Sequence, residues 1–302
     1  MNSSVTRGLH SLRLNQLGEI TRRALVSWFE DDAPSMGAAL AFYTLFAIAP
    51  ILLAVIWLAG TFLGTDLVEE HVLAQMGNLL GGTGTAAVRA LLASVRHSPR
   101  NGYSAAAELI TLLIGATSVF AELQNALSRI WRTPPRGAVQ GLWHLVRARL
   151  LSFGLILVLG FLLLVSLLAN AGLEGLGTWL GKFTAEWYRV VFVLYVLLRF
   201  AITTVLFAMI YKYVPHEQIA WGDVWVGSLV TALLFSAGKF IIVVYLGRMA
   251  VTSVYGIAGS FLVLLLWVYY AAQIFLLGAE FTCEYAYGRG SRAGHMQDPQ
   301  PR

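Results

Sequence analysis

Long uncharged stretches dominate the hydrophobic pattern of this chain. Residues 37–63, 150–169 and 249–279 contain no Asp, Glu, Lys or Arg. A helix needs about 20 apolar residues to cross the hydrocarbon core of a bilayer. Each stretch therefore predicts one membrane-spanning helix.

Three further spans are predicted in apolar stretches that include charged residues. They are residues 103–130, which contain Glu108, Glu122 and Arg129, residues 190–211, which contain Arg199, and residues 224–247, which contain Lys239. Turn-forming Pro and Gly residues separate these segments. The pattern predicts an all-α transmembrane bundle of six spans.

Amphipathic segments flank the first span. Before it, Leu17, Ile20, Ala24 and Trp28 share one helical face, which predicts an interfacial helix within an N-terminal segment, residues 1–35. After it, residues 66–98 predict two amphipathic helices on the outer surface, broken at Gly81-Gly82-Thr83-Gly84. The membrane domain spans residues 36–285, and the polar residues 286–302 predict a disordered tail.

Composition and charge agree with a membrane protein. Hydrophobic residues make up 58% of the chain and charged residues only 12%, against about 25% charged in soluble domains. The net charge of +5 comes from basic residues beside apolar segments, so it does not indicate nucleic-acid binding. With the N-terminus inside, inner segments hold roughly twice as many Lys and Arg as outer ones, which predicts that both termini are cytoplasmic.

Ionisable residues inside the spans are the strongest functional candidates, because each is costly to bury in lipid. Arg199 near the midplane and Lys239 in the outer half suit an anionic substrate group. Lys239 could instead form a structural ion pair with Glu108 or snorkel toward the headgroups. Glu122 and Glu280 are expected to share the inner half of the bundle.

Other candidates are polar or helix-distorting. Pro50 predicts a kink in the first span, which would serve as a hinge or fit the packing. Polar side chains in the spans would line a cavity or, as we favour, hydrogen-bond between helices: Tyr43, Thr44, Thr203, Thr204, Tyr255 and Gln273.

The sequence offers no pattern for catalysis, metal or cofactor binding. The six His residues are scattered without ligand spacing, and the single cysteine, Cys283, excludes an intramolecular disulfide. The chain has no Walker A loop and no compelling Ser-His-Asp set. We therefore expect neither an enzyme nor an ATPase.

Three ordered motifs suggest a family. They are Met36-Gly37-Ala38-Ala39-Leu40-Ala41-Phe42-Tyr43-Thr44-Leu45-Phe46-Ala47-Ile48-Ala49-Pro50, Glu122-Leu123-Gln124-Asn125-Ala126-Leu127 followed by Arg129-Ile130-Trp131, and Tyr255-Gly256 with Trp267, Tyr270 and Leu277-Gly278-Ala279-Glu280. From about residue 25 to 285 the chain resembles the YihY/BrkB family of bacterial inner-membrane proteins.

The resemblance implies six spans with cytoplasmic ends and a role in moving envelope lipids. Family members have also been labelled virulence factors and ribonuclease BN, but the chain has no residues suited to ribonuclease chemistry. Our first hypothesis is a transporter or flippase for a phospholipid or other anionic envelope lipid, without its own ATPase. The alternatives are a non-catalytic scaffold for envelope proteins, which would be its partners alongside lipids or a second copy, and an intramembrane hydrolase.

Overall fold

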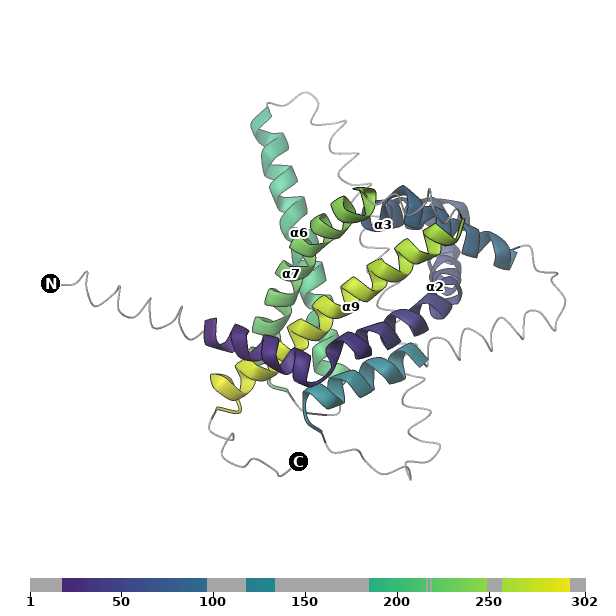
Figure 1. The fold of residues 1–302 in the computed structure, drawn as a ribbon. Coiled ribbons are helices and arrows are strands. Elements are labelled where there is room, and N and C mark those ends of the chain that lie inside the picture. Colours follow the sequence, from purple (N-terminus) through teal and green to yellow (C-terminus); the bar gives the residue numbers. More distant parts are fainter. Residues whose placement is uncertain are drawn as a thin grey trace.

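The protein is helical throughout the part that the computed structural model describes, which comprises residues 18–96, 118–133, 185–215, 217, 219–248 and 257–293. The helices are residues 18–30, α2 (Ala33–Leu63), α3 (Thr65–Arg96), residues 118–130, α6 (Ala185–Tyr213), α7 (Trp221–Arg248) and α9 (Ile257–Gly288). Figure 1 shows α9 running between α2 and α7. No strand occurs within these ranges.

Within the described residues, three helices are long and apolar enough to cross a membrane. The candidate spans are Val196–Tyr213, Trp221–Ile242 and Phe261–Gly288, and they match the predicted fourth, fifth and sixth spans. The predicted first span corresponds to α2, which has an apolar segment at Ala33–Ile48 and continues as a helix to Leu63. The chain is therefore a helical membrane protein.

The other predicted spans fall largely outside the described residues. Of the second, only residues 118–130 are described, and the third, residues 150–169, lies wholly outside. The count of six spans and the orientation of the termini remain predictions.

The last span continues past its predicted end at residue 279. The α9 helix runs from Ile257 to Gly288 within the described residues, so that Glu280 and Glu284 both lie in the helix. Both side chains are buried against protein. The predicted end at residue 279 was wrong because it was set by the first charged residue after the uncharged stretch. A carboxyl group that packs against other helices does not have to end a helix.

Close backbone approach joins α9 to α7. A Cβ atom built on Gly278 would lie 2.0 Å from Oγ1 of Thr231, and one on Gly227 would lie 1.8 Å from Oγ1 of Thr282. Small residues let membrane helices approach closely, where packing and hydrogen bonds replace the hydrophobic driving force. These contacts also fix the register of the two antiparallel helices.

The two ends of the described chain meet at one end of the helical bundle. Our predicted orientation places this end on the cytoplasmic side of the membrane. Ile20 and Ala24, on the helix of residues 18–30, are buried against Phe281 of α9. The face that the sequence assigns to the membrane surface therefore packs on the bundle, because α9 extends far enough to cover it. Leu25, Val26 and Phe29 lie exposed on other parts of this helix.

The beginning of the predicted tail belongs to the folded molecule. The backbone N–H and hydroxyl of Ser291 donate to the Asp223 carboxylate, the hydroxyl at 2.6 Å. The Arg292 guanidinium pairs with Glu217 at 2.9 Å. These contacts tie the chain after α9 to the segment that leads into α7.

Helix α3 differs from the two separate helices expected around Gly81-Gly82-Thr83-Gly84. It is helical from Thr65 to Arg96 without a break. A Cβ atom on Gly77 would nevertheless lie 3.6 Å from Oγ1 of Thr85, whereas eight residues of straight helix span about 12 Å. The helix must therefore bend sharply here, and its two limbs bury Val68 and Val88 in one cluster.

Candidate functional site

Two cations face the same region of the bundle from neighbouring helices. Antiparallel packing of α6 on α7, seen in the ring contact of Phe207 with Phe235 at 5.7 Å between centroids, brings Arg199 toward Lys239. Their charges are close enough to repel each other. Lys239 is half-buried and Arg199 is exposed. We call Arg199 and Lys239 the cation pair.

Neither member of the cation pair forms an ion pair with a carboxylate of the described residues. The predicted partner of Lys239, Glu108, lies outside them. Both side chains can donate charge-assisted hydrogen bonds to a phosphate. The arrangement suits an anionic ligand.

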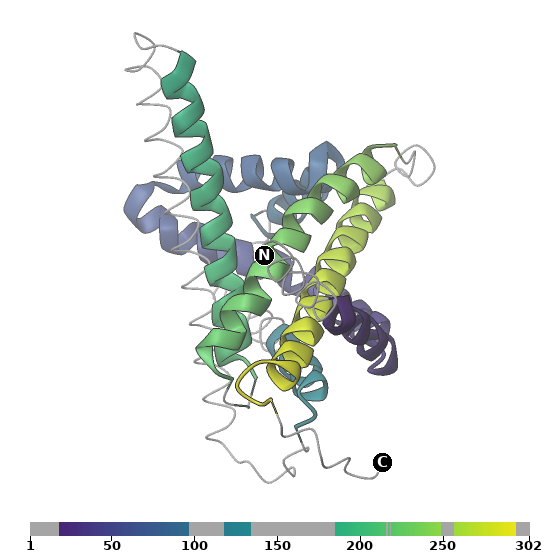
Figure 2. The same cartoon turned by 90° about the vertical axis from the view of Figure 1, so that its left-hand side faces the viewer.

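Exposed apolar side chains flank both cations along their helices. They include Leu194 and Leu197 on α6 and Phe240 and Ile241 on α7. Figure 2 shows α6 projecting well beyond the other helices at its N-terminal end. An anion bound here would therefore have apolar surface next to it.

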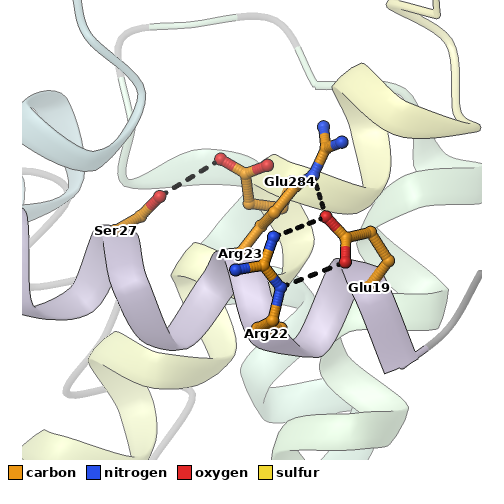
Figure 3. Close-up of polar contacts among 5 residues, drawn as sticks. All are labelled: Glu19, Arg22, Arg23, Ser27 and Glu284. Atoms are coloured by element: carbon orange, nitrogen blue, oxygen red, sulfur yellow. Dashed lines mark hydrogen bonds and ion pairs between the residues drawn. The ribbon is translucent and has the colours of Figure 1, made fainter.

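A second polar site, the acid cluster, lies where the N-terminal helix meets α9. It comprises Asp31, Glu280 and Glu284. The Glu280 side chain is 1% exposed and lies within hydrogen-bonding range of Asp31. The hydroxyl of Ser27 donates to Glu284 at 3.3 Å, as Figure 3 shows. Arg132, which follows the helix of residues 118–130, approaches Glu284 at 3.9 Å.

Glu122 and Glu280 make no contact with each other in the described structure, and their shared position in the inner half of the bundle stays a prediction. Glu122 is half-buried on the helix of residues 118–130 and makes no hydrogen bond or ion pair with the described residues. Asp31, which the sequence did not single out, approaches Glu280 instead. Asp32 adopts the left-handed conformation, with φ 58°, and this tight turn brings Asp31 to α9.

Gln273 forms the interhelical contact that its sequence predicted. Its amide nitrogen donates to the carbonyl oxygens of Ala33 and Pro34, both at 3.4 Å. A Cβ atom on Gly37 would lie 2.0 Å from this nitrogen, so α2 and α9 come close at the glycine. Thr203, in contrast, bonds to the carbonyl of Arg199 in its own helix.

The remaining candidates do not join either polar site. Tyr43 is exposed and contacts the ring of Phe42 at 5.7 Å. Pro50 lies inside α2, which stays helical on both sides of it. Tyr255 lies outside the described residues.

The sequence reasoning missed Tyr211, which links three spans. Its hydroxyl donates to the carbonyl oxygen of Phe275 at 2.8 Å and lies 3.0 Å from the hydroxyl of Thr231. The side chain is 1% exposed. The only signal in the sequence was a polar hydroxyl in an otherwise apolar segment, because a buried Tyr hydroxyl usually finds a hydrogen-bond partner.

The two polar sites lie far apart along the bundle. Gly238 meets Tyr270 and Thr231 meets Gly278, so that Lys239 is displaced from the level of Glu280 by about ten residues, or about 15 Å of helix. Among the described residues, no group of three His, Cys, Asp or Glu side chains is placed to hold a metal ion. The cation pair and the acid cluster are therefore separate sites.

Comparison with known proteins now identifies the family. The family model described as "Virulence factor BrkB" matches residues 24–301. The chain belongs to the BrkB family. This agrees with the resemblance seen in the sequence motifs, and it extends the likeness to the region that follows α9.

Relatives of this BrkB-family chain include proteins named UPF0761 membrane protein. One from Ralstonia nicotianae is 27% identical over 287 residues, which cover 91% of this chain and 60% of the relative. One from Psychromonas ingrahamii is 25% identical, covering 84% of this chain and 82% of the relative.

One from Verminephrobacter eiseniae is 33% identical over 57% of this chain and 39% of its own length. The BrkB-family chain thus spans less than two thirds of the Ralstonia and Verminephrobacter relatives. The names of these relatives give a membrane location and no reaction. No solved structure matches the chain.

Proposed function

We propose that the protein is a transporter or flippase that moves a phospholipid or another anionic envelope lipid across the bacterial inner membrane without an ATPase of its own. The observation that carries the proposal is the cation pair, Arg199 and Lys239, on two adjacent candidate spans. We further propose the inner membrane as its location, with both termini in the cytoplasm.

The chemistry of a lipid headgroup fits the cation pair. A phosphate placed between a guanidinium and an ammonium would relieve their repulsion and accept hydrogen bonds from both. The exposed apolar surface of α6 next to Arg199 would meet the acyl chains of the same molecule. A lipid therefore satisfies both the charge and the apolar surroundings, whereas a small soluble anion satisfies only the charge.

Two other functions fit the described geometry less well. An intramembrane hydrolase would need an acid and a base at one substrate bond, but Glu280 and Lys239 differ in level by about 15 Å. A scaffold for envelope proteins would bind its partners through the spans and would not need the cation pair. A negative transport test would favour this alternative.

Reconstitution into liposomes tests the proposal. Fluorescently tagged phosphatidylglycerol should exchange between leaflets faster with the protein than in protein-free liposomes. Lys239→Met and Arg199→Met, which keep an unbranched apolar side chain and remove the charge, should each slow exchange about tenfold or more, as expected when one charged contact of about 1.5 kcal/mol or more is lost. Lys239→Arg should retain most of the rate.

The matched control is Arg23→Gln, which removes an exposed cation on the helix of residues 18–30. Its exchange rate should equal that of the unmodified protein. Exchange no faster than in protein-free liposomes would refute transport, and a stable co-purified envelope protein would then favour a scaffold. Equal loss in Arg23→Gln and Lys239→Met would show that total charge, and not the cation pair, determines the rate.

A further inference from the structure

The acid cluster is built around a carboxyl group that the fold buries completely. Glu280 is 1% exposed, and its Oε1 atom is buried without a hydrogen-bond partner. It lies two helical turns after Gln273 on α9, and therefore on the same face, which packs against the start of α2. A charged oxygen in such surroundings would lose its hydration without compensation.

Groups from every neighbouring element face this carboxyl. The turn before α2 contributes Asp31, α9 itself contributes Glu284 and Cys283, and the segment after the helix of residues 118–130 contributes Arg132. The single cation stands 3.9 Å from Glu284 and is itself 64% exposed. Among these described groups, the negative charge of three carboxylates would exceed the positive charge of one arginine.

Two hydrogen-bond donors on the segments that form the acid cluster are also unsatisfied. The indole Nε1 of Trp28 and the hydroxyl of Thr133 are buried without partners. Trp28 follows Ser27, which bonds to Glu284, and Thr133 follows Arg132, which approaches the same carboxylate. Each of the three segments that supply the cluster therefore has a buried polar atom without a partner, which is unusual in a packed interior.

The contact between Asp31 and Glu280 requires a proton. Two carboxylates have only acceptor oxygens, so a hydrogen bond between them forms only when one of them is protonated. A metal ion is a poorer occupant, because no three acidic, His or Cys side chains of the described residues are placed to hold one. The site therefore suits the smallest cation.

We propose that Asp31 and Glu280 form a proton-binding site that joins the N-terminal helix to α9. Glu280 holds the proton, because its side chain is 1% exposed and its buried Oε1 atom has no hydrogen-bond partner. Loss of this proton leaves two adjacent buried negative charges and weakens the packing of the turn at Asp31 against α9. The proposal does not depend on lipid transport, although proton binding here would be a means of coupling it.

Infrared spectroscopy of the full-length protein in detergent tests this site directly. A protonated carboxyl gives a C=O band distinct from that of a carboxylate, and its frequency shifts in D₂O. We expect one such band from the buried pair at neutral pH, and we expect it to disappear on alkaline titration. Glu280→Gln, which preserves shape and cannot hold this proton, should lack the band, and Asp31→Asn should shift it.

The matched control is Glu284→Gln, which removes the neighbouring acid but leaves the pair intact and should keep the band. Circular dichroism of each variant establishes that the helices are retained. A wild-type spectrum without the band, or a band that persists unchanged in Glu280→Gln, would overturn the proposal. Loss of the wild-type band on addition of NaCl at constant pH would also overturn it, because the site would then take Na⁺.

Discussion

Gly278 sets how closely α7 can approach α9. A side chain there would overlap both the Thr231 hydroxyl, at 2.0 Å, and the Tyr211 hydroxyl, at 2.6 Å. We predict that Gly278→Ala lowers the free energy of unfolding by about 1–3 kcal/mol, the usual cost of overpacking. Thermal unfolding in detergent measures this effect.

Gly222→Ala is the control for this prediction. A Cβ atom at Gly222 would meet nothing within 4 Å, and alanine favours a helix more than glycine does. The control should be as stable as the unmodified protein or slightly more so. If both substitutions lowered stability equally, the close approach of α7 and α9 at Gly278 would not be the cause.

At the residue scale, the sequence identified the ionisable side chains that are costly to bury in a membrane, but it did not identify the residues that they contact. Arg199, Lys239 and Glu280 stood out because ionisable groups are rare in apolar segments. The proximity of Glu280 to Asp31 could not be predicted, because it depends on the left-handed turn at Asp32 and on a contact between distant parts of the chain. Hydropathy contains no information about either.

The segment after α9 is held by one arginine with several contacts. The Arg292 guanidinium pairs with Glu217 and stacks 5.6 Å from the centroid of the Trp131 ring. We predict that Arg292→Ala destabilises the protein by about 1–2 kcal/mol, because packing, a cation–π contact and a half-buried ion pair are lost together. Limited proteolysis should also cleave the variant faster after α9.

Arg289 provides a matched control, since it is an exposed arginine three residues earlier. Arg289→Ala should leave both the unfolding transition and the cleavage rate unchanged. Equal sensitivity of the two variants would indicate a general effect of charge near the end of α9.

Glu19 gives the N-terminal helix a dependence on acid pH. Hydrogen bonds from Arg22 and then Arg23 lower the pKa of the Glu19 carboxyl to about 2. A lowered carboxyl pKa stabilises the folded state above the ordinary value of 4.5, and this contribution is lost as the pH falls toward 2. The group is fully exposed, so the effect should be small and should weaken in salt.

Comparison of Glu19→Gln with the unmodified protein tests this pH dependence. Any difference between their melting temperatures should be greatest above about pH 4.5 at low ionic strength and should vanish toward pH 2. A difference that grows as the pH falls would contradict the assignment.

At the element scale, the long apolar helices were predictable and their ends were not. Apolar runs located α6 and α7 to within a few residues, because a lipid environment imposes a simple requirement of length and hydropathy. The ends of α9 and the bend in α3 depend on what each segment packs against. Glu280 and Glu284, which follow the uncharged stretch, lie buried inside the α9 helix.

At the scale of the whole molecule, the helix of residues 18–30 and the end of α9 must lie on the same side of the membrane, because Ser27 bonds to Glu284. We predict that Arg23→Cys and Arg289→Cys, at two exposed positions, react with a membrane-impermeant maleimide from one side only. The loop charges predict that this side is the cytoplasm. Cys283→Ser provides a suitable background, although the native thiol is itself buried.

Labelling of the two positions from opposite sides would contradict the packing of the N-terminal helix on α9. Labelling of both from the periplasmic side would instead preserve that packing and reverse the predicted orientation. The sequence alone supports the orientation through its charge distribution, but it does not reveal that these two segments touch.

The contact between Ser27 and Glu284 joins residues 257 positions apart, and this has a consequence for biosynthesis. At about 5–20 residues per second, the ribosome needs roughly 10–50 s to make the intervening chain. The apolar face of the helix of residues 18–30 therefore has no α9 to pack against until α9 has been synthesised. The acid cluster, assembled from both, can form only when translation is nearly finished.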